Sequence, residues 1–208
     1  MTESAQVLFN LIKNRRSIRR YKETPISEAV IKRLLEAATW SPSAHNRQPW
    51  RFAVLTKLAD KVKLAEAMGA RLQADRTADG DDPADIARDV ARSYDRLTRA
   101  PVLITVCLSM ADMDVYSDPR RNQHEWVMAA QSTAMAAQNL LLMAEASGLA
   151  ACWLCAPLFV PELVRQTLAL PVDWQPQGLI TLGEAAEVRQ KSRQRLESKI
   201  LFLDLTGF

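Results

Sequence analysis

Segments in which apolar residues recur at the helical period alternate along the chain with shorter, continuous apolar runs. The helical period dominates, and Ser27 is a good N-cap for the second helical segment. The segments predicted to be helical are 4–14, 28–38, 57–73, 84–98, 123–147 and 161–170. Helices therefore outweigh strands in the predicted structure.

Strand-like runs lie between these helices. The run 101–109, PVLITVCLS, is nearly continuous in apolar and β-branched residues, which predicts a strand buried on both faces. Shorter runs at 51–56, 149–155 and 178–183 predict three more strands. The terminal run 200–205, ILFLDL, is also strand-like, and a lone strand needs a sheet edge, which a partner subunit can supply.

The longest predicted helix, 123–147, should be central to the fold or to a subunit interface. Its apolar residues lie on nearly all sides, and Gly148 stands where a C′ glycine belongs. The mixed order of helices and strands favours an α+β or layered α/β fold. We expect one domain over 1–208, with 188–208 as a C-terminal extension.

One acidic segment interrupts the helical pattern. Residues 74–83 contain four aspartates and Gly80, which predicts a mobile, non-helical loop between two helices. Such a loop is a candidate lid over a substrate.

Composition narrows the classes of function. The apolar content of 48% and the net charge of +3 are ordinary, so they give no sign of nucleic-acid or membrane binding. No signal peptide is recognisable, and three cysteines do not suggest a disulfide framework. We therefore expect a cytoplasmic protein.

Two basic segments are candidates for binding a phosphate group. RRSIRR, residues 15–20, offers guanidinium groups and a serine hydroxyl, although a solvated basic turn explains the same residues. In the tail, Lys191 and Arg193 point to one side of an extended chain. Together these cations suit a phosphate monoester, which carries about −1.5 to −2 charges.

The segment WSPSAHNRQPW, from Trp40 to Trp50, is too polar and too rigid for a simple connector. Two prolines predict an irregular loop whose backbone groups are free for a ligand, and the two tryptophans should pack its ends. The histidines, His45 and His124, lack the neighbours of a hydrolase triad. Neither GxGxxG nor GxxxxGK[ST] occurs.

The cysteines of CWLC, Cys152 and Cys155, lie in an apolar strand-like run. A redox CxxC usually opens a helix, and zinc needs a second pair of ligands. We therefore expect buried structural cysteines and no metal site.

Four motifs in matching order, RRSIRRY, SPSAHNRQPWRF, GLAACWL and KSR, resemble the nitroreductase family of FMN-dependent oxidoreductases over essentially the whole chain. The resemblance implies a mixed central sheet flanked by helices. It also implies a homodimer with FMN at its interface and a C-terminal strand exchanged with the partner. Hydride then passes in ping-pong fashion through flavin N5, so no catalytic side chain is expected.

The resemblance also assigns residues to the cofactor. Arg15, Arg16, Ser17 and Arg19 would hold the phosphate, the ribityl chain and the pyrimidine end of the flavin, and Lys191 and Arg193 would complete the phosphate site. From the opposite subunit, the residues lining the ring would be Pro42, Ser43, Ala44, Asn46 and Gln48. The backbone of Leu154, Cys155, Ala156 and Pro157 would face the ring, Arg71 would reach the pyrimidine carbonyls, and His45 and His124 would contact substrate.

Within the family, residues 78–104 and 148–183 are most similar to the C-terminal reductase module of the deazaflavin-coenzyme gamma-glutamyl ligase. The chain departs from that module in two places. One is LCAP, and the other is the loop SAHNRQPW, which is nearer to other nitroreductases. The electron donor is then NADH, NADPH or a reduced deazaflavin. The acceptor is a nitroaromatic, a quinone or a dehydro precursor of the deazaflavin coenzyme. Two alternatives stay open: a synthase that fragments its own flavin, and a non-enzymatic nucleotide- or nucleic-acid-binding module.

Overall fold

The computed structural model describes residues 1–203, and its centre is a four-stranded sheet. The strands are β1 (Trp50–Leu55), β2 (Val102–Ser109), β3 (Ala150–Leu154) and β4 (Trp174–Gly183). Their order is β1-β2-β4-β3, with antiparallel pairing throughout. A single parallel bridge joins Ser17 to Ala151 at the outer edge of β3. The predicted α+β class is confirmed.

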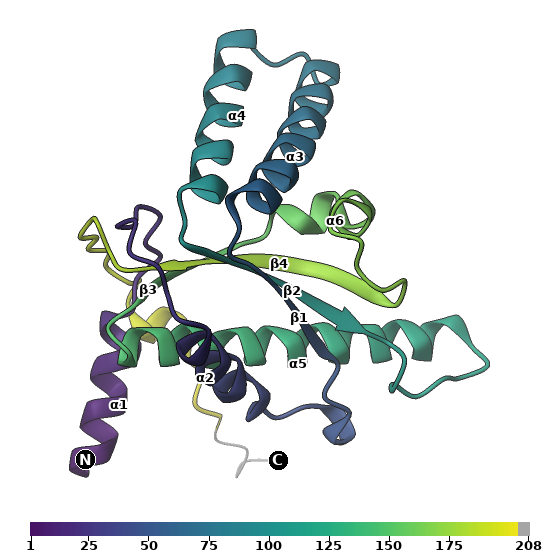
Figure 1. Ribbon diagram of the computed structural model, residues 1–208. Coiled ribbons are helices and arrows are strands. Elements are labelled where there is room, and N and C mark those ends of the chain that lie inside the picture. Colours follow the sequence, from purple (N-terminus) through teal and green to yellow (C-terminus); the bar gives the residue numbers. More distant parts are fainter. Residues whose placement is uncertain (204–208) are drawn as a thin grey trace.

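Helices cover both faces of the sheet (Figure 1). The helices are α1 (Glu3–Asn14), α2 (Glu28–Thr39), α3 (Leu58–Ala78), α4 (Pro83–Thr98), α5 (Pro119–Ala146) and α6 (Pro161–Thr167). Short 3-10 turns lie at η1 (Ala44–Asn46), η2 (Ala156–Phe159) and η3 (Leu196–Ser198). Helices α2 and α5 lie on one face, and α3, α4 and α6 on the other (Figure 1).

Strand β2 contributes to two separate cores because successive side chains point to opposite faces. Val102, Ile104 and Val106 pack with α2 and α5, whereas Leu103 packs with α3, α4 and α6. Every residue of β2 is buried. The prediction of a strand buried on both faces is therefore confirmed.

The long central helix is also confirmed, and it begins four residues before its predicted start. The Asp118 side chain accepts a hydrogen bond from the backbone N–H of Arg121, and Pro119 occupies the first turn. At the other end Gly148 has φ +72° and donates to Glu145 O, while Leu149 N donates to Ala144 O. These bonds form the expected glycine-terminated C-cap.

The prediction of an irregular loop over 74–83 is wrong. Helix α3 continues to Ala78, and α4 begins at Pro83 after only a short turn. Asp82 caps α4 by accepting from two backbone N–H groups, and Arg76 pairs with Asp81 at 2.6 Å. The aspartates therefore act as a helix cap and as ion-pair partners within a helical hairpin.

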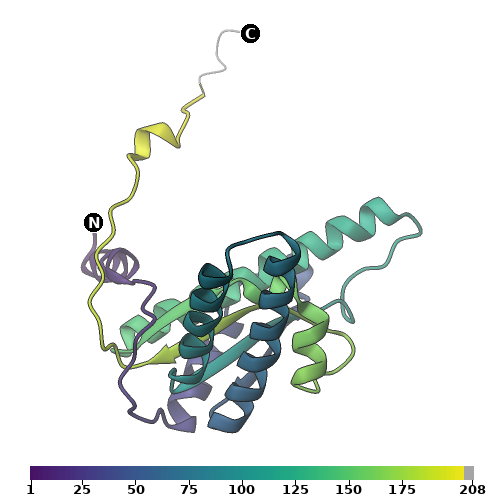
Figure 2. The same cartoon turned by 90° about the horizontal axis from the view of Figure 1, so that it is seen from above.

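Strand β4 begins earlier than predicted, at Trp174, and includes Pro176. The register with β2 shifts between Val106 and Cys107, so a bulge accommodates the proline. After β4 the chain leaves the sheet as an extended segment (Figure 2). Ile200–Leu203 has no regular structure, and the rest of the predicted strand 200–205 lies outside the described residues. Within residues 1–203, no helix has the length and apolar character needed to cross a bilayer.

Candidate functional site

The basic segment Arg15–Arg19 runs as extended chain along the outer edge of β3. Ser17 forms the bridge to Ala151, and Ile18 N donates to Ala151 O at 3.3 Å. Arg19 N donates to Glu187 Oε1 at 2.9 Å, which ties the segment to the chain that follows β4. The β-like backbone therefore presents alternate side chains to opposite sides.

The arginines of this segment therefore point to two different sides of it. Burial raises the pKa of the Cys152 thiol, and Arg19, Ser17 and Arg15 partly oppose that rise, so these three residues lie on the Cys152 side. Arg16 lines a different cavity together with Ile18. The structure therefore does not bring all the predicted basic residues to one side of the segment.

Arg19 opens onto a cavity of about 680 Å³ between this segment and α4. The lining residues are Arg19, Arg20, Tyr21, Ala91, Arg92, Asp95, Arg96, Arg99, Ala186 and Arg189. We call it the arginine cavity, because six of the ten are arginines. Such a concentration of guanidinium groups favours an anionic ligand.

Arg96 is the residue that the sequence interpretation missed. Burial, followed by the charges of Arg92 and Arg19, lowers its pKa below the usual value. Within the described residues Arg96 forms no ion pair, whereas Arg92, Arg99 and Arg189 each have a carboxylate partner. The spacing of Arg92, Arg96 and Arg99 along one helix face was a signal that could have revealed this group.

Arg16 and Lys191 meet in a neighbouring cavity of about 520 Å³, which shares Arg189 with the arginine cavity. The Arg16 Nε is buried without a hydrogen-bond partner in the described residues, so this N–H can donate to a ligand oxygen. Arg193 is exposed and donates to Ser192 O at 3.5 Å. The structure thus brings Lys191, and not Arg193, to the basic segment.

Arg71 lies elsewhere, on the exposed surface of α3. Its Nε donates to Asp75 Oδ1 at 2.6 Å, an i,i+4 pair. Arg71 does not line the arginine cavity, where Arg96 of α4 stands beside Arg19.

The loop between α2 and β1 has an unusual backbone. His45, Asn46 and Gln48 have φ of 48°, 54° and 51°, which side chains other than glycine rarely adopt. Ser43 Oγ accepts from Gln48 N at 3.0 Å and holds the turn. Non-glycine residues in this region of φ mark functional sites because the surrounding structure must enforce them.

Two ion pairs and two hydrogen bonds fix this loop to the rest of the fold, and one of these hydrogen bonds runs from Ser109 N of β2 to Pro49 O at 2.8 Å. Arg47 pairs with Asp114, Arg51 pairs with Asp112 at 3.0 Å, and Ala44 N donates to Ser132 Oγ of α5. Of the predicted loop residues, Ser43 and Ala44 are half-buried, and Pro42, Asn46 and Gln48 are exposed.

The two tryptophans that bracket the loop differ. Trp50 is buried in the core, as predicted, but the Trp40 side chain is 82% exposed. The prediction that both pack the loop ends is therefore wrong for Trp40.

The loop and the basic segment lie at diagonally opposite corners of the sheet (Figure 1). The loop leads into β1, and the basic segment borders β3, the other edge strand. Trp50 pairs with Leu108, whereas Ala151 lies at the level of Leu182 and Val102, six residues along β2. At about 3.3 Å per residue and 4.8 Å per strand, the corners are more than about 20 Å apart.

The turn after β3 lies on the same edge as the basic segment. Leu154 is half-buried, Cys155 and Ala156 are exposed, and Pro157 is buried. Trp153 Nε1 donates to Cys155 Sγ at 3.0 Å. The prediction of two buried structural cysteines holds for Cys152 and is wrong for Cys155.

The remaining predicted residues, His45 and His124, are both exposed. His45 is in the η1 turn and His124 is in the first turns of α5, so they belong to the loop's side of the molecule.

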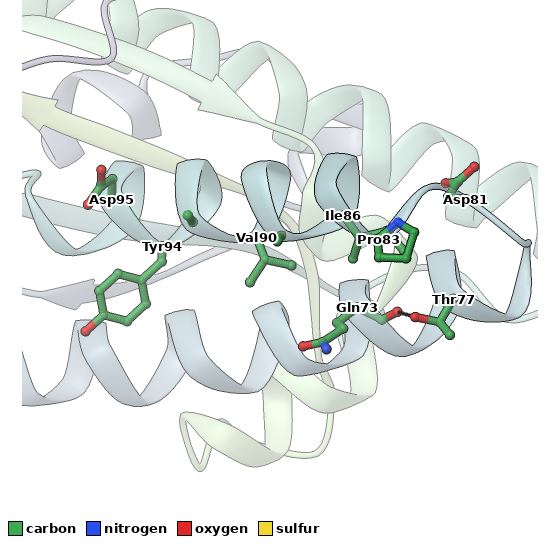
Figure 3. A pocket seen from close by; sticks show the side chains of 10 residues that line it. Gln73, Thr77, Asp81, Pro83, Ile86, Val90, Tyr94 and Asp95 are labelled. Atoms are coloured by element: carbon green, nitrogen blue, oxygen red, sulfur yellow. Dashed lines mark hydrogen bonds between the residues drawn. The ribbon is translucent and has the colours of Figure 1, made fainter.

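A second cavity, of about 490 Å³, runs along the groove between α3 and α4 (Figure 3). We call it the α3–α4 groove. Ile86 and Val90 lie in its middle, Asp81 lies at one end, and Tyr94 and Asp95 lie at the other (Figure 3). Ala91 and Asp95 also line the arginine cavity, so the two cavities adjoin.

Comparison with known proteins adds independent evidence. A family model described as the nitroreductase family matches residues 12–184. The chain is 29% identical over 213 residues to an NADH dehydrogenase of Thermus thermophilus, covering 90% of this chain and 92% of the relative. It is 30% identical over 180 residues to a Methanothermobacter thermautotrophicus protein assigned as an NADH dehydrogenase or NAD(P)H nitroreductase, covering 85% and 76%.

Solved structures agree in fold. A Desulfovibrio desulfuricans protein assigned as a nitroreductase and solved with FMN has a TM-score of 0.72 at 27% identity, covering 95% of this chain and 97% of that one. The FMN-dependent nitroreductase NfnB of Mycobacterium smegmatis, in complex with NADPH, has a TM-score of 0.74 at 22% identity, covering 97% and 100%.

Proposed function

Because the chain belongs to the nitroreductase family and is an FMN-dependent oxidoreductase, we propose that it reduces an electron-poor organic acceptor with a reduced nicotinamide. The observation that carries this proposal is the arginine cavity, in which Arg19 and the unpaired Arg96 stand together. An anionic cofactor relieves the repulsion between such guanidinium groups.

The residues present fit FMN. The phosphate of FMN needs two or three cations, and the basic segment with Lys191 supplies them. We assign the phosphate and ribityl chain to Arg15, Arg16 and Ser17, with Lys191 of the tail closing over them. The buried, unpartnered Nε of Arg16 supports this assignment.

FMN, when bound, supplies ping-pong hydride transfer through its N5 atom. Arg19 and Arg96 would hold the pyrimidine end of the ring and stabilise negative charge there. The backbone N–H groups of the Leu154–Pro157 turn would face the ring. Both histidines are exposed, so we assign proton supply to solvent.

We propose that two subunits form each site. Pro42, Ser43, Ala44, Asn46 and Gln48 would line the ring of the partner's flavin with uncharged groups. The separation of more than about 20 Å between the corners supports this, because one chain cannot place both beside one cofactor.

Exposed apolar surface also supports a homodimer. Helix α1 buries none of its side chains, although Val7, Leu8, Phe9 and Ile12 are about half exposed. Trp40 and Ile200–Leu203 are exposed as well. We propose that the partner covers these residues and that the terminal run adds a strand to the partner's sheet, where β1 pairs only with β2 among the described strands.

The first experiment measures flavin binding. The purified protein should be yellow, or should bind added FMN with one FMN per chain, and should be a dimer by light scattering. A colourless protein that takes up no FMN contradicts the proposal.

The second experiment identifies the donor and the acceptor. NADH, NADPH and a reduced deazaflavin are compared anaerobically as reductants of the bound flavin. Nitroaromatics, quinones and the dehydro precursor of the deazaflavin coenzyme are then compared as oxidants. Reduction by none of the donors contradicts the proposed activity, and product analysis in air detects fragmentation of the flavin itself.

A further inference from the structure

The arginine cavity holds more positive charge than one flavin neutralises. Six arginines line it. Their carboxylate partners are Asp89, Asp95 and Glu187, which leaves Arg19, Arg20 and Arg96 without a carboxylate partner among residues 1–203. A phosphate monoester supplies only about −1.5 to −2 charges, and Arg15, Arg16 and Lys191 are available to it as well.

The α4 side of the cavity contributes Arg96, which has no carboxylate partner in residues 1–203, and two arginines in exposed ion pairs. Arg92 and Arg99 are one turn from Arg96 on either side, so they share its helix face. Their side chains are 54% and 79% exposed, in ion pairs with Asp89 and Asp95. Exposed ion pairs contribute little to stability, so a ligand anion can replace the carboxylates as partner.

The α3–α4 groove continues from this point. It meets the arginine cavity at Ala91 and Asp95, and its floor around Ile86 and Val90 is apolar (Figure 3). A molecule with one acidic end and an apolar body therefore fits both surfaces, with its acidic end in the arginine cavity and its apolar body in the adjoining groove.

On the basis of the proposed function, we propose that this oxidoreductase takes an organic anion as one of its two substrates. Arg92 and Arg99 would bind the phosphate or carboxylate group, and the α3–α4 groove would hold the apolar body. Two sources share this chemistry: an acidic acceptor, and the additional phosphate that distinguishes NADPH from NADH.

The test uses the FMN-loaded protein with matched substrates. The Arg92→Gln/Arg99→Gln variant is compared with Arg88→Gln, a change on the same helix that lies outside the cavity lining. 4-Nitrobenzoate is compared with 4-nitrobenzamide, and NADPH with NADH. We expect kcat/KM for one charged partner to fall about ten- to a hundredfold, as for loss of a charged hydrogen bond, while its neutral counterpart changes little.

The charged compound whose kcat/KM falls distinguishes the two sources. A loss with 4-nitrobenzoate indicates an acidic acceptor, and a loss with NADPH indicates the donor.

A second pair of variants tests the groove. Ala87→Glu places a carboxylate in its lining, whereas Ala84→Glu lies on α4 outside it. Only Ala87→Glu should raise KM for the charged substrate.

Equal losses with charged and neutral partners would overturn the proposal. Loss of FMN from the Arg92→Gln/Arg99→Gln variant would also overturn it, since these arginines would then belong to the flavin site. Failure of the unmodified protein to bind FMN is a different result, which contradicts the proposed function instead.

Discussion

The two corners of the sheet that we assign to the flavin site are built in opposite ways. The β3 corner is extended chain, bridged to Ala151 and rich in guanidinium groups. The β1 corner is a loop in which three residues other than glycine have positive φ. Its predicted ligand residues carry no charge.

The difference follows from what each corner would contact. A phosphate and a charged pyrimidine edge need cations on a rigid backbone. A neutral ring needs uncharged donors and acceptors, and the loop keeps its polar groups available through a strained backbone. The first corner is therefore defined by charge and the second by conformation.

The largest effect is expected from two variants that each disable one of the two corners. Arg15→Ala/Arg19→Ala disables the β3 corner, and Asn46→Gly/Gln48→Gly removes loop side chains while preserving the left-handed backbone. Each variant alone should be inactive. Co-expression should restore about a quarter of the activity, because half of the dimers are mixed and each has one intact site.

The mixed dimers are then purified with two different tags, and they should show about half of the unmodified activity, because one of their two sites is intact. No recovery in a confirmed mixed dimer contradicts a site shared between subunits.

The next largest effect is expected from removing positive charge at the β3 corner. Arg15→Ala or Lys191→Ala removes one charged hydrogen bond to phosphate. FMN affinity should fall about ten- to a hundredfold, equivalent to roughly 1.5–3 kcal/mol. Fluorescence titration measures the change, with Arg88→Ala of α4 as the control. Unchanged affinity in both variants refutes the phosphate assignment.

The conformation of the β1 corner predicts a smaller effect on stability. His45→Val places a β-branched residue at φ 48° and should destabilise the fold by about 1–2 kcal/mol. His45→Asn should be nearly neutral, because asparagine tolerates this region. Urea unfolding of the two variants makes the comparison, and equal stabilities would show that the loop backbone adapts.

The smallest effect concerns the attachment of the loop. Arg47→Ala removes the exposed pair with Asp114 and should cost less than about 1 kcal/mol, declining further at high salt. Unfolding at two salt concentrations measures it. A loss well above that range would mean that this ion pair, rather than the η1 hydrogen bonds, holds the loop.

Much of the secondary structure could be predicted because local patterns suffice for it. The buried strand β2, the Ser27 cap and the Gly148 terminus each depend on a few neighbouring residues. The prediction failed at 74–83, where aspartates typical of loops serve as a cap and as ion-pair partners. There the tertiary partner of each carboxylate decided the structure.

In the candidate site as well, local patterns predicted some features and tertiary contacts decided others. RRSIRR and the loop could be proposed as ligand-binding segments because their residue types suit that chemistry. Arg71 was chosen and Arg96 was missed, because both are arginines on helices and only packing brings one of them beside Arg19. Likewise, no local pattern indicated that Cys155 would be exposed while Cys152 is buried.

The sequence by itself determined the helices, the strand buried on both faces and the chemical character of the two segments, since these properties depend on residue type and spacing. Only the tertiary structure decided that the segments lie at opposite corners and that α4 joins the basic segment around one cavity. The physical reason is the strand order β1-β2-β4-β3, which results from burying both sheet faces at once. That order depends on contacts between residues far apart in the chain.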